Sequence, residues 1–234
     1  MLNIRQIAVN MFRENTYLLW NGGPSCAIVD PGCQSDDEFR ALTELIGQNG
    51  LTPAAILVTH GHHDHIFGVK KLLGHYGDMP VYMTATDRDL LVSGGFFVDF
   101  LCRDKVDTDF PVTEVSDAGK VTVADMEFEV IATPGHSPGS VCWLDRSHSV
   151  MFTGDTLFAG TIGRTDLPHC EYDDEIRSIM EKLLPLDPGT RIFPGHGPGS
   201  TIGRERCGNP FLEPFNEPEE EIPEDLAPVS IKGF

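Results

Sequence analysis

The stretch Thr59-His60-Gly61-His62-His63-Asp64-His65 places four imidazoles and one carboxylate within six residues. It directly follows residues 54–58, an apolar run that we predict to be a buried strand. Neutral imidazole and carboxylate groups are ligands of zinc and other borderline divalent metals. In an extended turn, alternate residues such as His60 and His62 can point toward the same metal position. Asp64 and His65 can then face a second metal position a few ångströms away. A solvated histidine-rich loop is the alternative for an isolated cluster, but this one is not isolated.

Three further predicted strands end in the same design. They close with Thr133-Pro134-Gly135-His136, Phe152-Thr153-Gly154-Asp155 and Phe193-Pro194-Gly195-His196. Glycine before the polar residue permits a tight turn and a close approach of the backbone. Taken alone, each histidine would be read as a hydrogen-bonded loop residue, and Asp155 as a turn residue or helix cap. Four strand ends of one design, which contain six of the nine histidines, favour one shared metal site.

Strands and helices alternate in two similar halves of the chain. The predicted strands are residues 16–20, 26–30, 54–58, 81–84, 120–123, 127–132, 140–144, 149–153 and 191–194. The predicted helices follow the capping box 35–38 as far as Gly50, and span residues 66–76, 86–101 with a break at Gly94-Gly95, and 173–184. Two runs of strands flanked by helices indicate two packed sheets with helices outside.

The charge of the chain argues against several classes of partner. There are 17 Lys+Arg against 36 Asp+Glu, a net charge of −19, whereas nucleic acids and anionic membranes attract clustered basic residues. Residues 1–20 lack the features of a signal peptide, and no run reaches the roughly 18–20 apolar residues of a membrane span. The six cysteines are scattered and are expected to be reduced thiols. We therefore predict a cytoplasmic protein without nucleic-acid or membrane partners.

The C-terminal end differs in composition from the rest. Residues 213–225 contain seven acids and three prolines, which is typical of a solvated, extended segment. Without these seven acids the net charge falls from −19 to −12. Ligands between His60 and His196 must converge on one site, so we predict one catalytic domain over residues 1–212. Residues 213–234 then form an acidic, proline-rich tail.

The histidine motif and the three strand-end sites together resemble the metallo-β-lactamase superfamily over roughly residues 1–210. Within it, the segments 133–140, 154–158 and 163–166 are most similar to the glyoxalase II-like hydrolases. The resemblance implies an α/β fold, the four-layer αββα sandwich, with a metal site at one edge. The helical C-terminal domain that binds glutathione in glyoxalase II is absent here, and Gly197-Pro198 follows His196 where a tyrosine is usual. A smaller or different thioester is therefore an alternative substrate.

The resemblance also implies a set of metal ligands for two divalent ions, zinc first, with iron or manganese as alternatives. His60, His62 and His136 would hold the first ion, Asp64, His65 and His196 the second, and Asp155 would bridge them. A hydroxide that bridges the two ions would attack the carbonyl of a small-molecule thioester, and Asp64 would orient it. A thiolate leaving group, with a pKa of about 8.5, departs without a strong general acid.

Substrate binding and reaction type each leave an alternative. Arg164 matches a basic residue that contacts the carboxylate of the thiol in the glyoxalase II pattern, and a structural ion pair with Asp166 is its alternative role. The main alternative function is that of a persulfide dioxygenase with one non-haem iron, held by His60, His136 and Asp155. The lack of a signal peptide argues against a secreted β-lactamase, and the net charge argues against a nuclease. A binding module without catalysis would be expected to have lost ligands.

Overall fold

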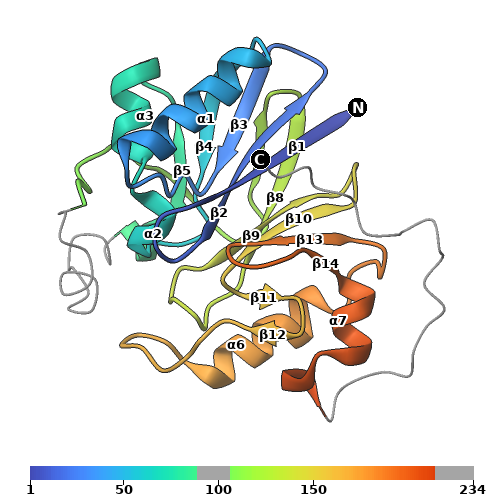
Figure 1. The fold of residues 1–234 in the computed structure, drawn as a ribbon. Helices are drawn as coiled ribbons and strands as arrows, with labels where there is room; N and C mark the ends of the chain where they lie inside the picture. The colour runs from blue at the N-terminus through green and yellow to red at the C-terminus, as the bar shows by residue number, and fades with distance from the viewer. Residues whose placement is uncertain (89–105, 214–234) are drawn as a thin grey trace.

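A computed structural model describes residues 1–88 and 106–213. Two six-stranded sheets pack against each other, and helices cover both outer faces (Figure 1). The predicted αββα sandwich is therefore confirmed. None of the described helices is both long enough and apolar enough to cross a membrane.

The first sheet has its strands in chain order, β1-β2-β3-β4-β5-β6. These are β1 (Leu2–Val9), β2 (Glu14–Asn21), β3 (Ser25–Val29), β4 (Thr52–Leu57), β5 (Val81–Thr84) and β6 (Thr113–Val115). The pairs from β1 to β3 are antiparallel, and those from β3 to β6 are parallel. Helices α1 (Asp36–Gln48) and α3 (Val69–Tyr76) lie on its outer face (Figure 1). Because parallel strands end at the same edge, the loops after β3 and β4 meet there.

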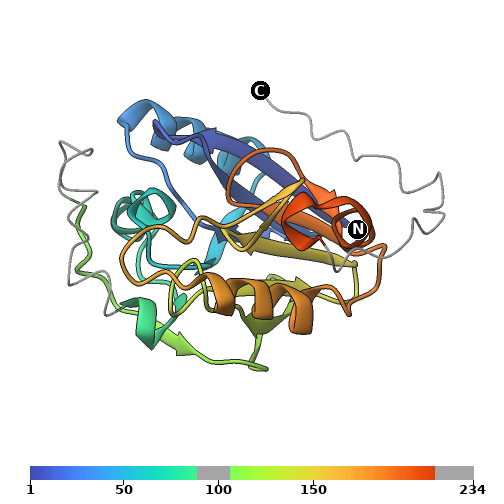
Figure 2. The same ribbon diagram turned by 90° about the horizontal axis from the view of Figure 1, so that it is seen from below.

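The second sheet has the order β14-β13-β10-β9-β8-β7. Its strands are β7 (Lys120–Val123), β8 (Met126–Ala132), β9 (Val141–Asp145), β10 (Val150–Gly154), β13 (Arg191–Pro194) and β14 (Ser200–Thr201). Its helical cover comprises α6 (Tyr172–Ser178), the π-helix Ile179–Leu183, α7 (Ile202–Gly208) and the short 3-10 helix Pro210–Leu212. Helix α6 lies on the opposite side of the two sheets from α1 (Figure 2). A small sheet of β11 (Leu157–Phe158) and β12 (Thr161–Ile162) follows β10.

Both faces of the central strands are buried, which fills three apolar layers. Along β2, Tyr17 and Leu19 face the space between the sheets, where they join Trp143 and Phe152 of the second sheet. Leu18 points the other way, into the layer beneath α1. A strand buried on both faces reads as an almost continuous apolar run, which is why the central strands could be predicted.

Three of the predicted helices differ in their bounds or continuity from the helices of the structure. The predicted helix 66–76 is broken into α2 (His63–Ile66) and α3, because the Gly68 N–H donates to Pro31 O at 2.7 Å, outside the helix. The predicted helix 173–184 begins at Tyr172 and widens into a π-helix after Ser178. Residues 85–88 are helical, but the rest of the predicted helix 86–101 lies outside the described residues.

Other predictions were incomplete or stay untested. Within residues 1–88 and 106–213, five strands and one α-helix were not predicted: β1, β6, β11, β12, β14 and α7. The predicted tail lies outside the described residues from position 214 onward, so the division into domain and tail stays a prediction.

The predicted capping box is present at the start of α1. The Glu38 N–H donates to Ser35 Oγ at 3.2 Å, and the Ser35 N–H donates to Glu38 Oε2 at 2.9 Å. We expect Ser35→Ala to lower the free energy of unfolding by about 1 kcal/mol in urea denaturation. Glu44→Ala, an exposed site in the same helix, is the control and should change it by less than about 0.5 kcal/mol. Equal effects of the two substitutions would contradict the capping role.

Candidate metal centre

The seven predicted ligand residues all follow strand ends, as the sequence indicated. The segment from His60 to His65 follows β4, His136 follows β8, Asp155 follows β10, and His196 follows β13. The structure brings their donor atoms together in groups whose members lie within 4.8 Å of one another. Residues up to 136 positions apart in the chain therefore meet at one edge of the sandwich.

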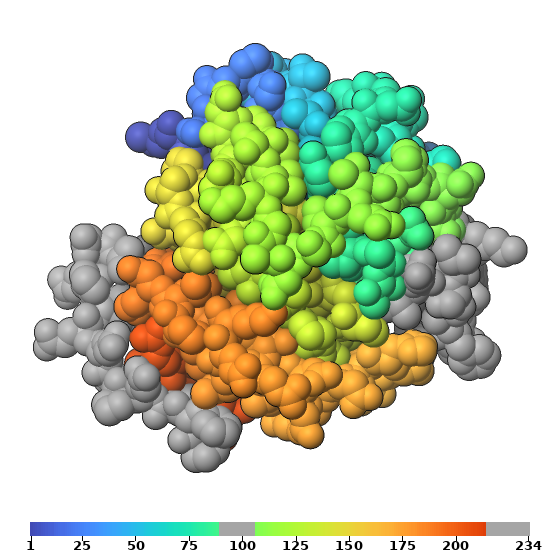
Figure 3. Space-filling model, turned by 180° about the vertical axis from the view of Figure 1, so that it is seen from behind, coloured from blue at the N-terminus to red at the C-terminus, as the bar shows by residue number. Residues whose placement is uncertain are grey.

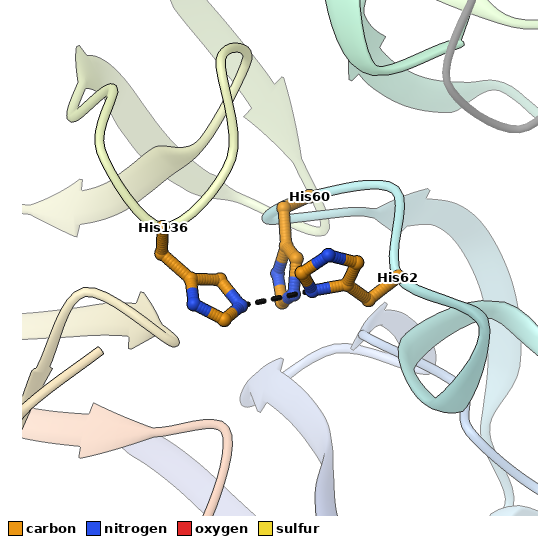
Figure 4. A group of neighbouring side chains, drawn as sticks. All are labelled: His60, His62 and His136. Atoms are coloured by element: carbon orange, nitrogen blue, oxygen red, sulfur yellow. Dashed lines mark hydrogen bonds between the residues drawn. The ribbon is translucent and has the colours of Figure 1, made fainter. Parts of the chain in front are cut away.

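The first group comprises His60, His62 and His136 (Figure 4). His136 Nε2 lies 2.8 Å from His62 Nδ1, and the ring centroids of His60 and His136 are 4.9 Å apart. His60 and His136 are buried, and His62 is partly buried. Figure 4 shows that the loop after β4 presents His60 and His62 to His136, which comes from a different loop.

The second group comprises Asp64, His65 and His196. His196 Nε2 lies 3.2 Å from Asp64 Oδ2, and His65 Nε2 lies 3.8 Å from the same oxygen. His65 is fully buried, whereas Asp64 and His196 keep a partial exposure. This group is therefore the more open of the two toward solvent.

Asp155 lies between the two groups and contacts both. Its Oδ1 lies 3.4 Å from His65 Nε2, and its Oδ2 lies 3.6 Å from His136 Nε2 and 3.5 Å from His196 Nε2. A Cβ on Gly195 would overlap Asp155 Oδ1, so glycine before His196 is required for this close approach. The position of Asp155 is the one that a bridging carboxylate would need.

The histidine nitrogens that point away from the centre bind protein oxygens. Such contacts fix the ring orientation and the tautomer of metal-binding histidines. The pairs are His60 Nδ1 with Thr59 Oγ1 at 3.0 Å, His65 Nδ1 with Asp30 Oδ2 at 3.0 Å, His136 Nδ1 with Arg164 O at 2.9 Å, and His196 Nδ1 with Phe12 O at 3.1 Å. Four of the five rings are therefore held with one nitrogen free to face the centre.

The donor atoms fit a divalent metal. His60 Nε2, His65 Nε2 and Asp155 Oδ1 are buried and have no hydrogen-bond partner among the described residues. A buried polar atom left unpaired costs about 1–3 kcal/mol, and three of them converge on the same edge. Divalent cations at this edge would supply partners for these atoms, so the residues present fit the metal that the fold implies.

Protonation states in the centre also suit a metal. Burial lowers the pKa of His60 well below its ordinary value, and burial lowers the pKa of His62 to about 3, so both rings are neutral. Burial acts to raise the pKa of Asp155, but the charge of His65 outweighs it and holds that pKa well below its ordinary value. Neutral imidazole and ionised carboxylate are the forms that bind metals.

The second group stabilises positive charge. Burial acts to lower the pKa of His65, but the carboxylates of Asp155 and Asp64 outweigh it and raise the pKa well above its ordinary value. The same two carboxylates would stabilise a metal cation between them.

Asp30 is an important residue that the sequence analysis missed. It accepts hydrogen bonds from the Thr59 N–H at 2.7 Å and the Thr59 hydroxyl at 2.6 Å, besides its contact with His65. It lies directly after β3 and two positions before Gly32, so it is a fifth aspartate or histidine at a strand end with a glycine close by. That signal was in the sequence and could have found it.

Arg164 reaches the centre through its main chain. Its carbonyl accepts from His136, while its guanidinium, about half exposed, pairs with both carboxylate oxygens of Asp166 at 2.8 and 2.9 Å. The alternative role predicted for Arg164, an ion pair with Asp166, is thus present. The structure does not bring its guanidinium into the groups described above, and substrate binding by Arg164 stays a proposal.

A cavity of about 510 Å³ is lined by residues of the segments 84–86, 114–116 and 132–140. Figure 3 shows the molecule from the side where the green segment that ends at residue 88 meets the yellow-green chain that follows residue 105. The lining of the cavity includes Thr84, Glu114, Ser116 and Pro138. As far as the described residues go, none of the seven predicted ligands lines it. The metal centre is therefore a separate feature of the surface.

Comparison with known proteins agrees with this geometry. The profile of the metallo-β-lactamase superfamily matches residues 9–196. Hydroxyacylglutathione hydrolase GloC of Haemophilus influenzae is 35% identical over 212 residues, which cover 90% of this chain and 98% of that protein. Among solved structures, the B3 metallo-β-lactamase BLEG-1 superposes with a TM-score of 0.82 at 36% identity, covering 91% of this chain and 100% of that one. A di-iron-bound form of TTHA1623 superposes with a TM-score of 0.77 at 35% identity, covering 88% and 99%. The chain therefore belongs to the metallo-β-lactamase superfamily, whose fold binds divalent metal ions.

Proposed function

We propose that the chain is a metal-dependent hydrolase of thioesters, of the glyoxalase II-like kind. The observation that carries the proposal is Asp155, set between two groups of three donors, in a chain similar to GloC. The match covers 90% of this chain and 98% of GloC, so it extends over almost the whole of that hydrolase. A glutathione thioester therefore returns as the first substrate to test.

Different residues of the site would hold the metal ions and orient the attacking water. In the proposal, His60, His62 and His136 hold one ion, Asp64, His65 and His196 hold the other, and Asp155 contacts both. The ions, when bound, would lower the pKa of a bound water towards ~7 and polarise the thioester carbonyl. Asp64 is partly exposed and keeps a pKa below its ordinary value, because the charge of His65 outweighs the effect of burial. An ionised Asp64 would accept a hydrogen bond from the attacking water and orient it.

Arg164 is the proposed contact for a carboxylate of the thiol. Its Nε and Nη2 already bind a carboxylate, that of Asp166, in the two-point geometry that a substrate carboxylate would adopt. Substrate binding would exchange one carboxylate for another at the same guanidinium. The binding free energy that this contact contributes is small because the guanidinium is exposed and solvent screens its charge.

We expect Arg164→Ala to raise KM for lactoylglutathione about two- to fivefold with little change in kcat, as for the loss of an exposed ion pair worth up to about 1 kcal/mol. KM for an N-acetylcysteamine thioester, whose thiol has no carboxylate, should not change. Arg177→Ala is the matched control, because Arg177 pairs with Asp174 in a similar exposed geometry. An equal rise of KM for both thioesters would show that Arg164 does not bind the carboxylate.

Metal analysis combined with a thioester assay tests the function. The purified protein should contain two divalent ions per chain and hydrolyse lactoylglutathione or a coenzyme A thioester. If it hydrolyses neither with metal bound, the proposal is wrong. One iron per chain, with oxygen uptake on a glutathione persulfide, would instead establish the dioxygenase.

Hydrolysis of β-lactams is a second candidate, favoured by the similarity to the B3 metallo-β-lactamase BLEG-1 at 36% identity over that whole chain. The same donor groups would serve the attack on a lactam carbonyl, because both reactions pass through a tetrahedral oxyanion. The ratio of kcat/KM for lactoylglutathione to that for a chromogenic cephalosporin decides between them. A ratio below one would make the lactam the better substrate and overturn the first proposal.

A further inference from the structure

The loop that carries His196 is held by Asn15, from the start of β2. Asn15 is 2% exposed, and its Nδ2 donates to Pro194 O at 3.0 Å and to Gly197 O at 2.9 Å. These two carbonyls lie on either side of His196, 179 and 182 positions away from Asn15 in the chain. One amide group thus uses both of its hydrogens to fix the backbone that presents the ring.

Neighbouring groups of the same segment, residues 12–17, make further contacts with this loop. The Asn15 N–H donates to Gly195 O at 2.7 Å, and the Tyr17 hydroxyl donates to Pro194 O at 2.7 Å. The Phe12 carbonyl binds His196 Nδ1. The ring orientation of His196 and the position of its loop therefore both depend on residues 12–17.

The first group is held by a different residue, Asp87. Its side chain is fully buried, and its Oδ2 accepts from the Gly61 N–H at 2.7 Å and from the Ser137 hydroxyl at 2.7 Å. Its Oδ1 accepts from the Gly139 N–H at 2.6 Å. One carboxylate thus ties the loop of His60 and His62 to the loop of His136.

These two sets of contacts share no residue. Asp87 binds Gly61, Ser137 and Gly139, which lie beside His60, His62 and His136, whereas Asn15 binds the two carbonyls that flank His196. Asp87 belongs to none of the groups of possible metal ligands among the described residues, and the Asn15 side chain donates to backbone carbonyls. Asp87 therefore acts on His60, His62 and His136, and Asn15 acts on His196, through the residues that flank these ligands. Asp155 contacts histidines of both groups.

We propose that Asp87 is the positioning residue of the first metal position and Asn15 that of the second, so that the two metal affinities are set separately. The inference rests on the metal centre of the proposed function and not on its substrate. Outer groups that orient metal ligands contribute about 10–100-fold to metal affinity. We expect the loss of either residue to lower the metal affinity by the same factor, at the first position for Asp87 and at the second for Asn15.

Isosteric variants test the proposal. Asn15→Asp replaces the Nδ2 donor with an oxygen that faces two carbonyls, and Asp87→Asn turns an amide N–H₂ toward backbone N–H groups. The metal-free protein of each is titrated calorimetrically with zinc and with cobalt(II). Imidazole signals of isotope-labelled histidines report which rings bind the metal.

The expected result is a crossed pattern. Asn15→Asp should weaken the position of His65 and His196 about 10–100-fold and leave the position of His60, His62 and His136 unchanged. Asp87→Asn should do the reverse, so each variant is the control for the other. Tyr17→Phe and Ser137→Ala each delete one hydroxyl from these contacts. Tyr17→Phe should weaken metal binding at the second position and Ser137→Ala at the first, each by a smaller factor than the isosteric variants. These two variants also decide the matter if an isosteric variant does not fold.

Several outcomes would overturn the inference: equal weakening of both positions, no weakening in any variant, or fewer than two metals in the wild-type protein. Failure of the proposed function looks different. A wild-type protein that binds two metals, shows the crossed pattern in its variants and hydrolyses no thioester would end the proposed function and support the inference. Thioester hydrolysis with unselective metal loss would do the opposite.

Discussion

Asp155→Ala should abolish thioester hydrolysis, lowering kcat/KM by roughly 10³-fold or more. Metal ions contribute several kcal/mol to the stabilisation of a transition state, and each 1.4 kcal/mol is about a tenfold change in rate. Asp155 contacts His136 in the first group and His65 and His196 in the second, so its loss affects both metal positions together. Metal analysis after dialysis should find both positions depleted.

Two variants make this result interpretable. Asp155→Asn keeps the shape but removes the negative charge, and should retain one metal at most. Glu127→Ala removes an exposed carboxylate on β8, which pairs with Lys120 in a surface contact, and should leave both metal content and activity unchanged. Full activity of Asp155→Ala with two bound metals would exclude a bridging role for this carboxylate.

The seven clustered residues could be predicted because their signal is local. Each lies a few positions beyond an apolar strand, and the edge where parallel strands end brings such positions together. The same reasoning would have found Asp30, which follows β3 directly. Strand β1 could not be found this way, because it is a half-exposed edge strand in which Leu2 and Ile4 alternate with polar residues.

The groups that hold the loops leave no such signal. Asn15 and Asp87 are single polar residues, and their partners lie as far as 182 and 52 positions away in the chain. Glu175 is a third example: in the sequence it is one acid among several at the start of an amphipathic helix. In the structure it is buried, and its Oε2 accepts from the His136 N–H at 2.9 Å. Burial raises the pKa of this carboxyl to about 8. Only the packing of α6 beneath the Gly135 turn reveals its position.

Gly163 lies where several parts of the centre meet. A Cβ at this position would overlap the Asp155 carbonyl, and would lie 2.7 Å from Glu175 Oε1 and 3.0 Å from His136 Cβ. The Gly163 N–H donates to Thr156 O at 3.0 Å, which holds the strand-end turn that carries Asp155. An added methyl group would therefore press on the backbone of Asp155 and on the buried carboxyl of Glu175. Movement of either neighbour would displace a proposed metal ligand, Asp155 in the first case and His136 in the second.

We accordingly expect Gly163→Ala to lower the free energy of unfolding by about 1–3 kcal/mol, as for overpacking in a dense core, and to displace Asp155 from His136. Gly74→Ala is the matched control, because a methyl group on Gly74, within α3, would meet no atom within 4 Å, and the substitution should stabilise by about 0.5–1 kcal/mol. Urea unfolding of the metal-free proteins measures the first effect. The displacement has its own signature: saturating zinc should raise the unfolding temperature of Gly163→Ala less than that of the wild type, because a displaced carboxylate binds metal more weakly. An equal rise for both would mean that the strain is absorbed outside the metal centre.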